Sequence, residues 1–150
     1  FCGSWFAPII GRFLDRRGVR QGLLLESVSV AAVFLYAAWA VHGVTSGALS
    51  GYAAMAAAFL AYILIFMTDH FNAVHTMLMR SLSESPADVM ENLSFGLSID
   101  HILAVTVSGL LGAVWKLSGP QWVFVLGAAV CAVDLAVALW LKRTETAPAK

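Results

Sequence analysis

Two aspartate–histidine dipeptides contain the side chains of this sequence that are best suited to chemistry. Asp69 precedes His70 and Asp100 precedes His101, each pair inside a long apolar segment, and His75 follows the first pair closely. A carboxylate beside an imidazole can exchange a proton, because burial and pairing bring both groups into the physiological pH range. One hypothesis is therefore a proton relay that uses His75, Asp100 and His101. The alternative is that these residues form a static, hydrogen-bonded polar pin.

Patterns for metal binding or enzyme catalysis are missing from the sequence. His70 and His75 lie about 140° apart around a helix, so they do not converge on one ion. There is no H-E-x-x-H, no Ser/His/Asp grouping and no phosphate-binding loop, so the sequence predicts no catalytic residue, no metal and no cofactor. The net charge is zero, which gives no argument for nucleic acid. Cys2 and Cys131 lie in apolar stretches and are interpreted as small hydrophobic residues.

The composition places these residues in a membrane protein. The chain of 150 residues is 60% hydrophobic and 12% charged, whereas soluble domains are about 45–50% apolar and about 25% charged. A soluble fold of this size could not bury so much apolar surface. The lipid bilayer is therefore the expected solvent of this chain.

Four segments are long enough to cross a bilayer, which takes roughly 20 mostly apolar residues. They are residues 21–42, 49–79, 93–117 and 121–142, and residues 1–10 resemble the end of a fifth span. The segments lack two-residue alternation, so we predict helices rather than strands. The predicted fold is an all-α polytopic membrane helix bundle that forms one membrane domain over residues 1–150.

The connectors between these segments carry turn and capping signals. "GVTSG" at 43–47 and "LSGP" at 117–120 are short and rich in turn-forming residues. The longer connector at 81–92 contains "SPAD", which predicts a helix start with Ser85 as the cap, Pro86 in the first turn and Asp88 near the positive helix end.

The positive charges predict the orientation of the spans. Four alternating spans divide the nine Lys and Arg residues eight to one between the two sides, with Lys116 alone on its side. Positive charge accumulates in cytoplasmic loops. Residues 11–20 and the C-terminus are therefore predicted to lie on the cytoplasmic side of the cell membrane.

The segment "GRFLDRRGVR" at 11–20 resembles the signature loop of the major facilitator superfamily, usually written G-x-x-x-D-R-x-G-R-R/K. Gly11, Asp15, Arg16, Gly18 and Arg20 match in position and type, whereas Val19 replaces a residue that is usually basic. We expect Gly11 to let helices approach closely and Gly18 to permit a tight turn. In the family, the aspartate and arginines form a charge-linked cytoplasmic latch between helices.

The resemblance implies a secondary active transporter of a small solute that works by alternating access. Four spans follow the loop, which fits helices nine to twelve of a twelve-helix transporter, with the N-terminal half of the same chain missing. The rival placement is helices three to six of the N-terminal half. A stand-alone multi-span protein with a structural or assembly role is the alternative from another functional class.

A polar stripe on the second span is the predicted transport pathway. On one continuous helix, a shared face would carry Tyr62, Asp69, Asn72, Thr76 and Arg80. These residues either line the pathway, with Arg80 near the cytoplasmic gate, or form a hydrogen-bonded contact between helices. His75 lies at the edge of the stripe.

The other polar residues of the spans have less defined roles. A packing seam with His101 as its pin is predicted on the third span from Ser94, Ser98, His101, Ser108 and Gly112. Glu26 lies close enough to the arginine-rich segment to snorkel to the interface or to pair with it. Asp134 has no partner that the sequence identifies.

Overall fold

Helices form all the regular structure in the part of the chain that the computed structural model describes, residues 3–68 and 71–140. The elements are α1 (Gly3–Arg17), α2 (Val19–Thr45), α3 (Gly51–Thr68), α4 (Asn72–Leu82), α5 (Pro86–Ser118) and α6 (Gln121–Trp140). Four stretches are long and apolar enough to cross a membrane, namely α2, the stretch Gly51–Leu82 that contains α3 and α4, α5, and α6. The all-α class predicted from the sequence is confirmed.

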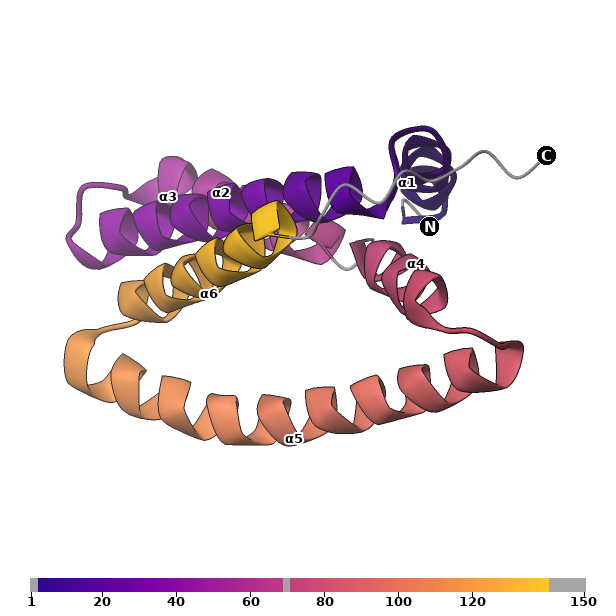
Figure 1. Ribbon diagram of the computed structural model, residues 1–150. Helices are drawn as coiled ribbons and strands as arrows, with labels where there is room; N and C mark the ends of the chain where they lie inside the picture. Colours follow the sequence, from indigo (N-terminus) through magenta and orange to yellow (C-terminus); the bar gives the residue numbers. More distant parts are fainter. Residues whose placement is uncertain (1–2, 69–70, 141–150) are drawn as a thin grey trace.

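The arginine-rich segment, expected as a turn over residues 11–20, is almost entirely helical. α1 continues to Arg17 and α2 begins at Val19, so Gly18 is the single residue between them. Gly18 has a φ of 80°, which a residue with a side chain rarely adopts. The chain changes direction sharply at this point (Figure 1). The tight turn at Gly18 is confirmed. The connection between α1 and α2 is this single glycine rather than a ten-residue loop.

The close helix approach expected at Gly11 occurs at Gly22 instead. A Cβ atom added to Gly11 would meet nothing within 4 Å. One added to Gly22 would collide with a side-chain methyl of Leu14 and lie 3.2 Å from Val74. Leu14 and Val74 are almost completely buried, so α1, α2 and α4 meet tightly around Gly22.

α2 is the central element, and it packs along α6 and α3 (Figure 1). The packing uses small residues: a Cβ atom on Gly127 of α6 would lie 3.1 Å from the Phe34 ring of α2. The buried small residues of these three helices include Ala37, Ala38, Ala40, Gly43, Ala57, Ala61, Cys131 and Ala138. Small residues let helix backbones approach closely in lipid, where large apolar side chains remain outside.

α5 begins with the cap predicted from the sequence. The Ser85 hydroxyl accepts a hydrogen bond from the Asp88 amide at 3.2 Å, and the Asp88 carboxylate accepts one from the Ser85 amide at 2.9 Å. Pro86 is the first residue of the helix. The predicted helix start is therefore confirmed, seven residues before the predicted span begins.

The packing seam predicted on α5 is not packed against any described helix. α5 has no buried residue, and it runs apart from α2, α3 and α6 along most of its length (Figure 1). The seam consists of Ser94, Ser98, His101, Ser108 and Gly112. The hydroxyls of Ser98 and Ser108 donate hydrogen bonds to backbone carbonyls of α5 itself. The seam therefore stays a prediction, because helical spacing groups residues on one face without determining what covers that face.

Candidate functional site

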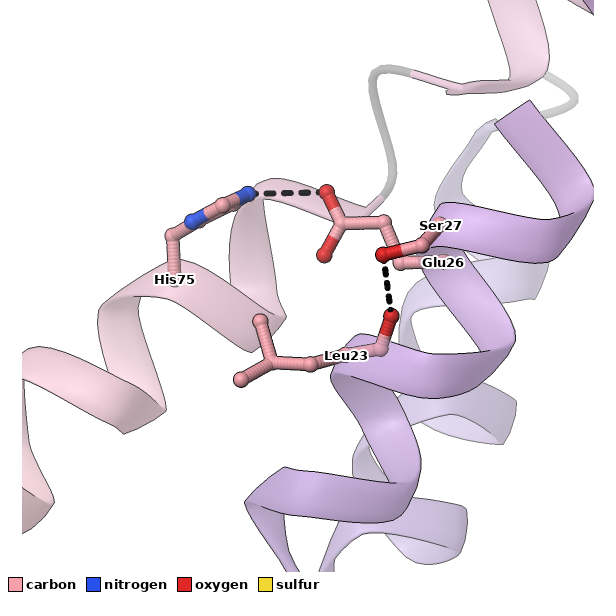
Figure 2. Close-up of polar contacts among 4 residues, drawn as sticks. All are labelled: Leu23, Glu26, Ser27 and His75. Carbon is pink, nitrogen blue, oxygen red and sulfur yellow. Dashed lines mark hydrogen bonds and ion pairs between the residues drawn. The ribbon is translucent and has the colours of Figure 1, made fainter. Parts of the chain in front are cut away.

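A carboxylate–imidazole contact joins α2 to α4. Glu26 Oε1 and His75 Nε2 lie 2.8 Å apart, and the two side chains point toward each other from their separate helices (Figure 2). Glu26 is mostly buried, with 16% of its side chain exposed, while 56% of the His75 side chain is exposed. A neutral imidazole donates a hydrogen bond here through Nε2–H, and a protonated one forms an ion pair. The contact is therefore compatible with two protonation states.

The expected pairing of Glu26 with the arginine-rich segment is wrong. Glu26 lies six residues after Arg20, which is about 240° around a helix, so the two side chains point in different directions. The guanidinium Nε of Arg20 instead donates a hydrogen bond to the Ala138 carbonyl at 3.2 Å. This contact ties the start of α2 to the last turn of α6, while Glu26 faces α4.

Ser27 lies beside Glu26 but is satisfied by its own helix. Its hydroxyl donates to the Leu23 carbonyl at 2.8 Å (Figure 2), and the residue is almost fully buried. This leaves His75 as the polar side chain that contacts Glu26. The Glu26 Oε2 atom is buried and has no hydrogen-bond partner in the described chain. Buried polar atoms are normally satisfied, so this oxygen is suited to accept a hydrogen bond from a proton donor.

Three helices enclose a cavity at this contact, with a volume of about 170 Å³. Its lining consists of Leu23, Glu26, Ser27, His75, Leu78, Asp134 and Val137. A water molecule takes about 30 Å³ in the liquid, so the cavity is large enough for several waters or one small polar group. We call this place, with its three ionisable residues Glu26, His75 and Asp134, the α2–α4–α6 site.

Asp134, which had no partner in the sequence, belongs to this site. It lines the same cavity from α6, together with Glu26 and His75. Two carboxylates and one imidazole therefore share a small volume between helices. Among the described residues no group of His, Cys, Asp and Glu side chains has the arrangement of a metal site. Proton exchange and the binding of a hydrogen-bond donor are the chemistry that this arrangement supports.

The predicted pathway residues are distributed over several surroundings. Tyr62 lines a separate apolar cavity of about 350 Å³, together with Ala37 and Phe124. Arg80 lies in a cleft with Ser83 and Glu84, where α4 leads into α5. Neither residue lines the α2–α4–α6 site.

The stripe as a whole depends on residues whose placement the structure does not describe. Asp69 and His70 lie outside the described residues, as does the side chain of Asn72. Thr76 is exposed on α4, next to His75. Helix α3 is described as far as Thr68 and α4 from Asn72, so a single continuous face stays a prediction.

The predicted relay residues are separated in part. His75 belongs to the α2–α4–α6 site, whereas Asp100 and His101 are exposed on α5. The matched residues of the signature-like segment are also separated: Gly11, Asp15 and Arg16 lie on α1, and Arg20 lies on α2. Within residues 3–68 and 71–140, neither Asp15 nor Arg16 makes an ion pair. Arg20 connects the signature-like segment to another helix, through its hydrogen bond to Ala138 of α6.

Sequence reasoning missed Glu26 and Asp134 as site residues. The available signal was their charge inside an apolar span, since ionisable residues there usually face a cavity or a partner. Comparison with family models, curated proteins and solved structures gave no match to this chain. The resemblance of residues 11–20 to the major facilitator superfamily therefore stays a prediction from the sequence.

Proposed function

We propose that this chain belongs to a secondary active transporter that moves a small solute by alternating access, with the proton as coupling ion. The observation that carries the proposal is the Glu26–His75 contact beside a cavity that Asp134 also lines. Ionisable side chains within spanning helices are energetically costly, and they commonly mark solute pathways or proton relays. The resemblance of residues 11–20 to a transporter signature supports the same class.

The α2–α4–α6 site would couple a proton to helix movement. The Glu26–His75 contact holds α4 against α2 in the present conformation. Protonation of Glu26 removes its charge and weakens that contact, so α4 is released from α2. A solute that donates a hydrogen bond to Glu26 Oε2 competes with the proton for the same carboxylate. Alternating access then opens the cavity first to one side of the membrane and next to the other.

The proposed surroundings of the chain are the cell membrane and further helices of a longer protein. We propose that it resides in the cell membrane with residues 11–20 and the C-terminus in the cytoplasm, supported by the eight-to-one division of basic residues. Helices from another half of a longer chain would complete the cavity wall. The bare faces of α5 support this arrangement, because a spanning helix without buried residues has room for neighbours.

Proton flux in proteoliposomes tests this function. The intact protein is reconstituted with a pH-sensitive dye inside, and gradients of small amines, sugars and amino acids are applied in turn. We expect at least one solute to drive proton movement, and we expect Glu26→Gln to reduce the rate at least about tenfold by removing the titrating group. Lys116→Gln is the matched control, because it removes a charge far from the site. Solute-driven flux that is equal in Glu26→Gln and the native protein would refute the proposal.

A structural or assembly role is the second candidate, and α5 is the observation that favours it. This helix of 33 residues has no buried side chain and exposes large apolar residues such as Phe95, Ile102 and Val105. Helices of a partner protein could cover that surface equally well in place of a second half of the same chain. Absence of solute-driven flux, together with stable co-purification of a different membrane protein, would favour this role over transport.

A further inference from the structure

α1 carries a group of arginines that lies outside the α2–α4–α6 site. Arg12, Arg16 and Arg17 line an open groove on the surface of this helix together with Ile9 and Phe13. Residues four apart are neighbours on a helix surface, so these side chains form two adjacent rows, one containing Arg12 and Arg16 and the other Ile9, Phe13 and Arg17. We call this surface the α1 cradle.

The α1 cradle concentrates three positive charges on a helix whose one acidic residue is Asp15. All three arginines are exposed, and none of them makes an ion pair with a residue in 3–68 or 71–140. Like charges four residues apart on a helix repel each other. The negative end of the helix dipole favours Arg16 and Arg17 in the last turn of α1. It does not reach Arg12, because the effect falls off within one turn.

Membrane orientation explains the number of these arginines but not their arrangement. A cytoplasmic loop gains its topological effect from Lys and Arg at any position near the span. Here the three arginines line one groove of α1 together with Ile9 and Phe13. A groove with cationic side chains beside apolar ones fits a ligand that has an anionic part and an apolar part.

We propose that the α1 cradle binds the phosphate headgroup of an anionic phospholipid. The planar guanidinium groups of Arg12 and Arg16 match phosphate oxygens with paired hydrogen bonds. Ile9 and Phe13 contact the glycerol and the first methylene groups of the acyl chains. Gly18 joins α1 directly to α2, which is long enough to span the membrane, so the cradle lies near the bilayer surface. Basic residues at this depth attract anionic lipids.

Lipid binding to the purified protein tests the proposal. The native protein in an uncharged detergent is titrated with phosphatidylglycerol and, separately, with phosphatidylcholine. Arg12→Gln/Arg16→Gln removes two charges from the cradle. Arg17→Gln is a milder single variant, and Lys116→Gln, which removes one exposed charge elsewhere, is its matched control. All four side chains are exposed, so we expect the variants to fold. Phosphatidylcholine binding equal to that of the native protein checks this.

We expect native protein and control to bind phosphatidylglycerol equally, and Arg12→Gln/Arg16→Gln to bind it roughly thirtyfold more weakly, at about 1 kcal/mol for each arginine. Arg17→Gln is expected to lose about fivefold by the same reasoning. Equal phosphatidylglycerol binding by the cradle variants and the control would overturn the proposal. Inorganic phosphate distinguishes a lipid from a free anion. If phosphate alone displaces the lipid as well as unlabelled phosphatidylglycerol does, the cradle recognises a free anion and the lipid proposal is overturned.

Discussion

Glu26 is a carboxylate held mostly out of water, and its environment determines the behaviour of the α2–α4–α6 site. One of its oxygens contacts His75 and the other has no partner in the described chain. Removal of one partner from a buried polar contact leaves the other unsatisfied, which costs more free energy than the contact itself contributes. The two members of this pair should therefore respond differently to substitution.

A double-mutant cycle on Glu26→Gln and His75→Ala should reveal this asymmetry. We expect His75→Ala to lower the free energy of unfolding by about 1–2 kcal/mol, because it leaves the Glu26 carboxylate unpaired. The coupling energy between the two positions should be about 1 kcal/mol, as for hydrogen bonds between membrane helices. Thermal unfolding in detergent measures both quantities.

Ser27→Ala is the control for this cycle. Ser27 lines the same cavity, but its hydroxyl is bonded within α2. We expect Ser27→Ala to show no coupling to His75→Ala. A coupling energy near zero between Glu26 and His75 themselves would contradict the contact.

The sequence could identify the ionisable residues of the site but not their grouping. Glu26, His75 and Asp134 each stand out as charged or titratable residues in apolar segments. Glu26 and His75 are 49 residues apart, however, and helical periodicity relates only residues of the same helix. For this reason the sequence did not identify His75 as the partner of Glu26. For the same reason it did not place Asp134 in the cavity with them.

At the scale of helices, glycine positions distinguish packed surfaces from open ones. Gly22 is enclosed by Leu14 and Val74, whereas a Cβ atom on Gly112 of α5 would meet nothing within 4 Å. The two glycines therefore make a matched pair for testing where the described helices are in close contact.

Gly22→Ala should destabilise the protein, and Gly112→Ala should not. We expect Gly22→Ala to reduce the free energy of unfolding by about 1–3 kcal/mol, because its neighbours are buried and have little room to move. Gly112→Ala should be neutral or stabilising by up to about 1 kcal/mol, since alanine favours helix. Chemical unfolding in detergent compares them. Equal stability of the two variants would mean that α1, α2 and α4 do not meet at Gly22.

Signals from adjacent residues predicted the helix ends. Contacts between distant parts of the chain could not be predicted in this way. The Ser85–Asp88 cap and the turn at Gly18 were predictable because each depends on a few adjacent residues. The length of the arginine-rich loop was overestimated, because its charge suggests a loop although arginine is a good helix former. The α5 seam stays a prediction, because the spacing of residues on one helix does not identify the helix that packs against it.

For the whole molecule, composition was the most informative property. A hydrophobic fraction of 60% and long uncharged segments predicted a membrane helix bundle, and the structure has four stretches that can span a bilayer. Composition does not specify which helices pack together. α2 packs along α3 and α6 and meets α1 and α4 at Gly22, whereas α5 runs apart from α2, α3 and α6 along most of its length (Figure 1). The central claim for the molecule is that the cavity between α2, α4 and α6 opens alternately to the two sides of the membrane.

Accessibility of Ser27 tests this claim most directly. Ser27→Cys, in a background with Cys2 and Cys131 replaced by alanine, places one thiol in the wall of the cavity. The measurement is its rate of reaction with a membrane-impermeant thiol reagent, applied separately to each side of reconstituted vesicles. The account predicts reaction from both sides, with Glu26→Gln raising the rate from one side and lowering it from the other. Reaction from a single side, or from neither, would contradict alternating access at this site.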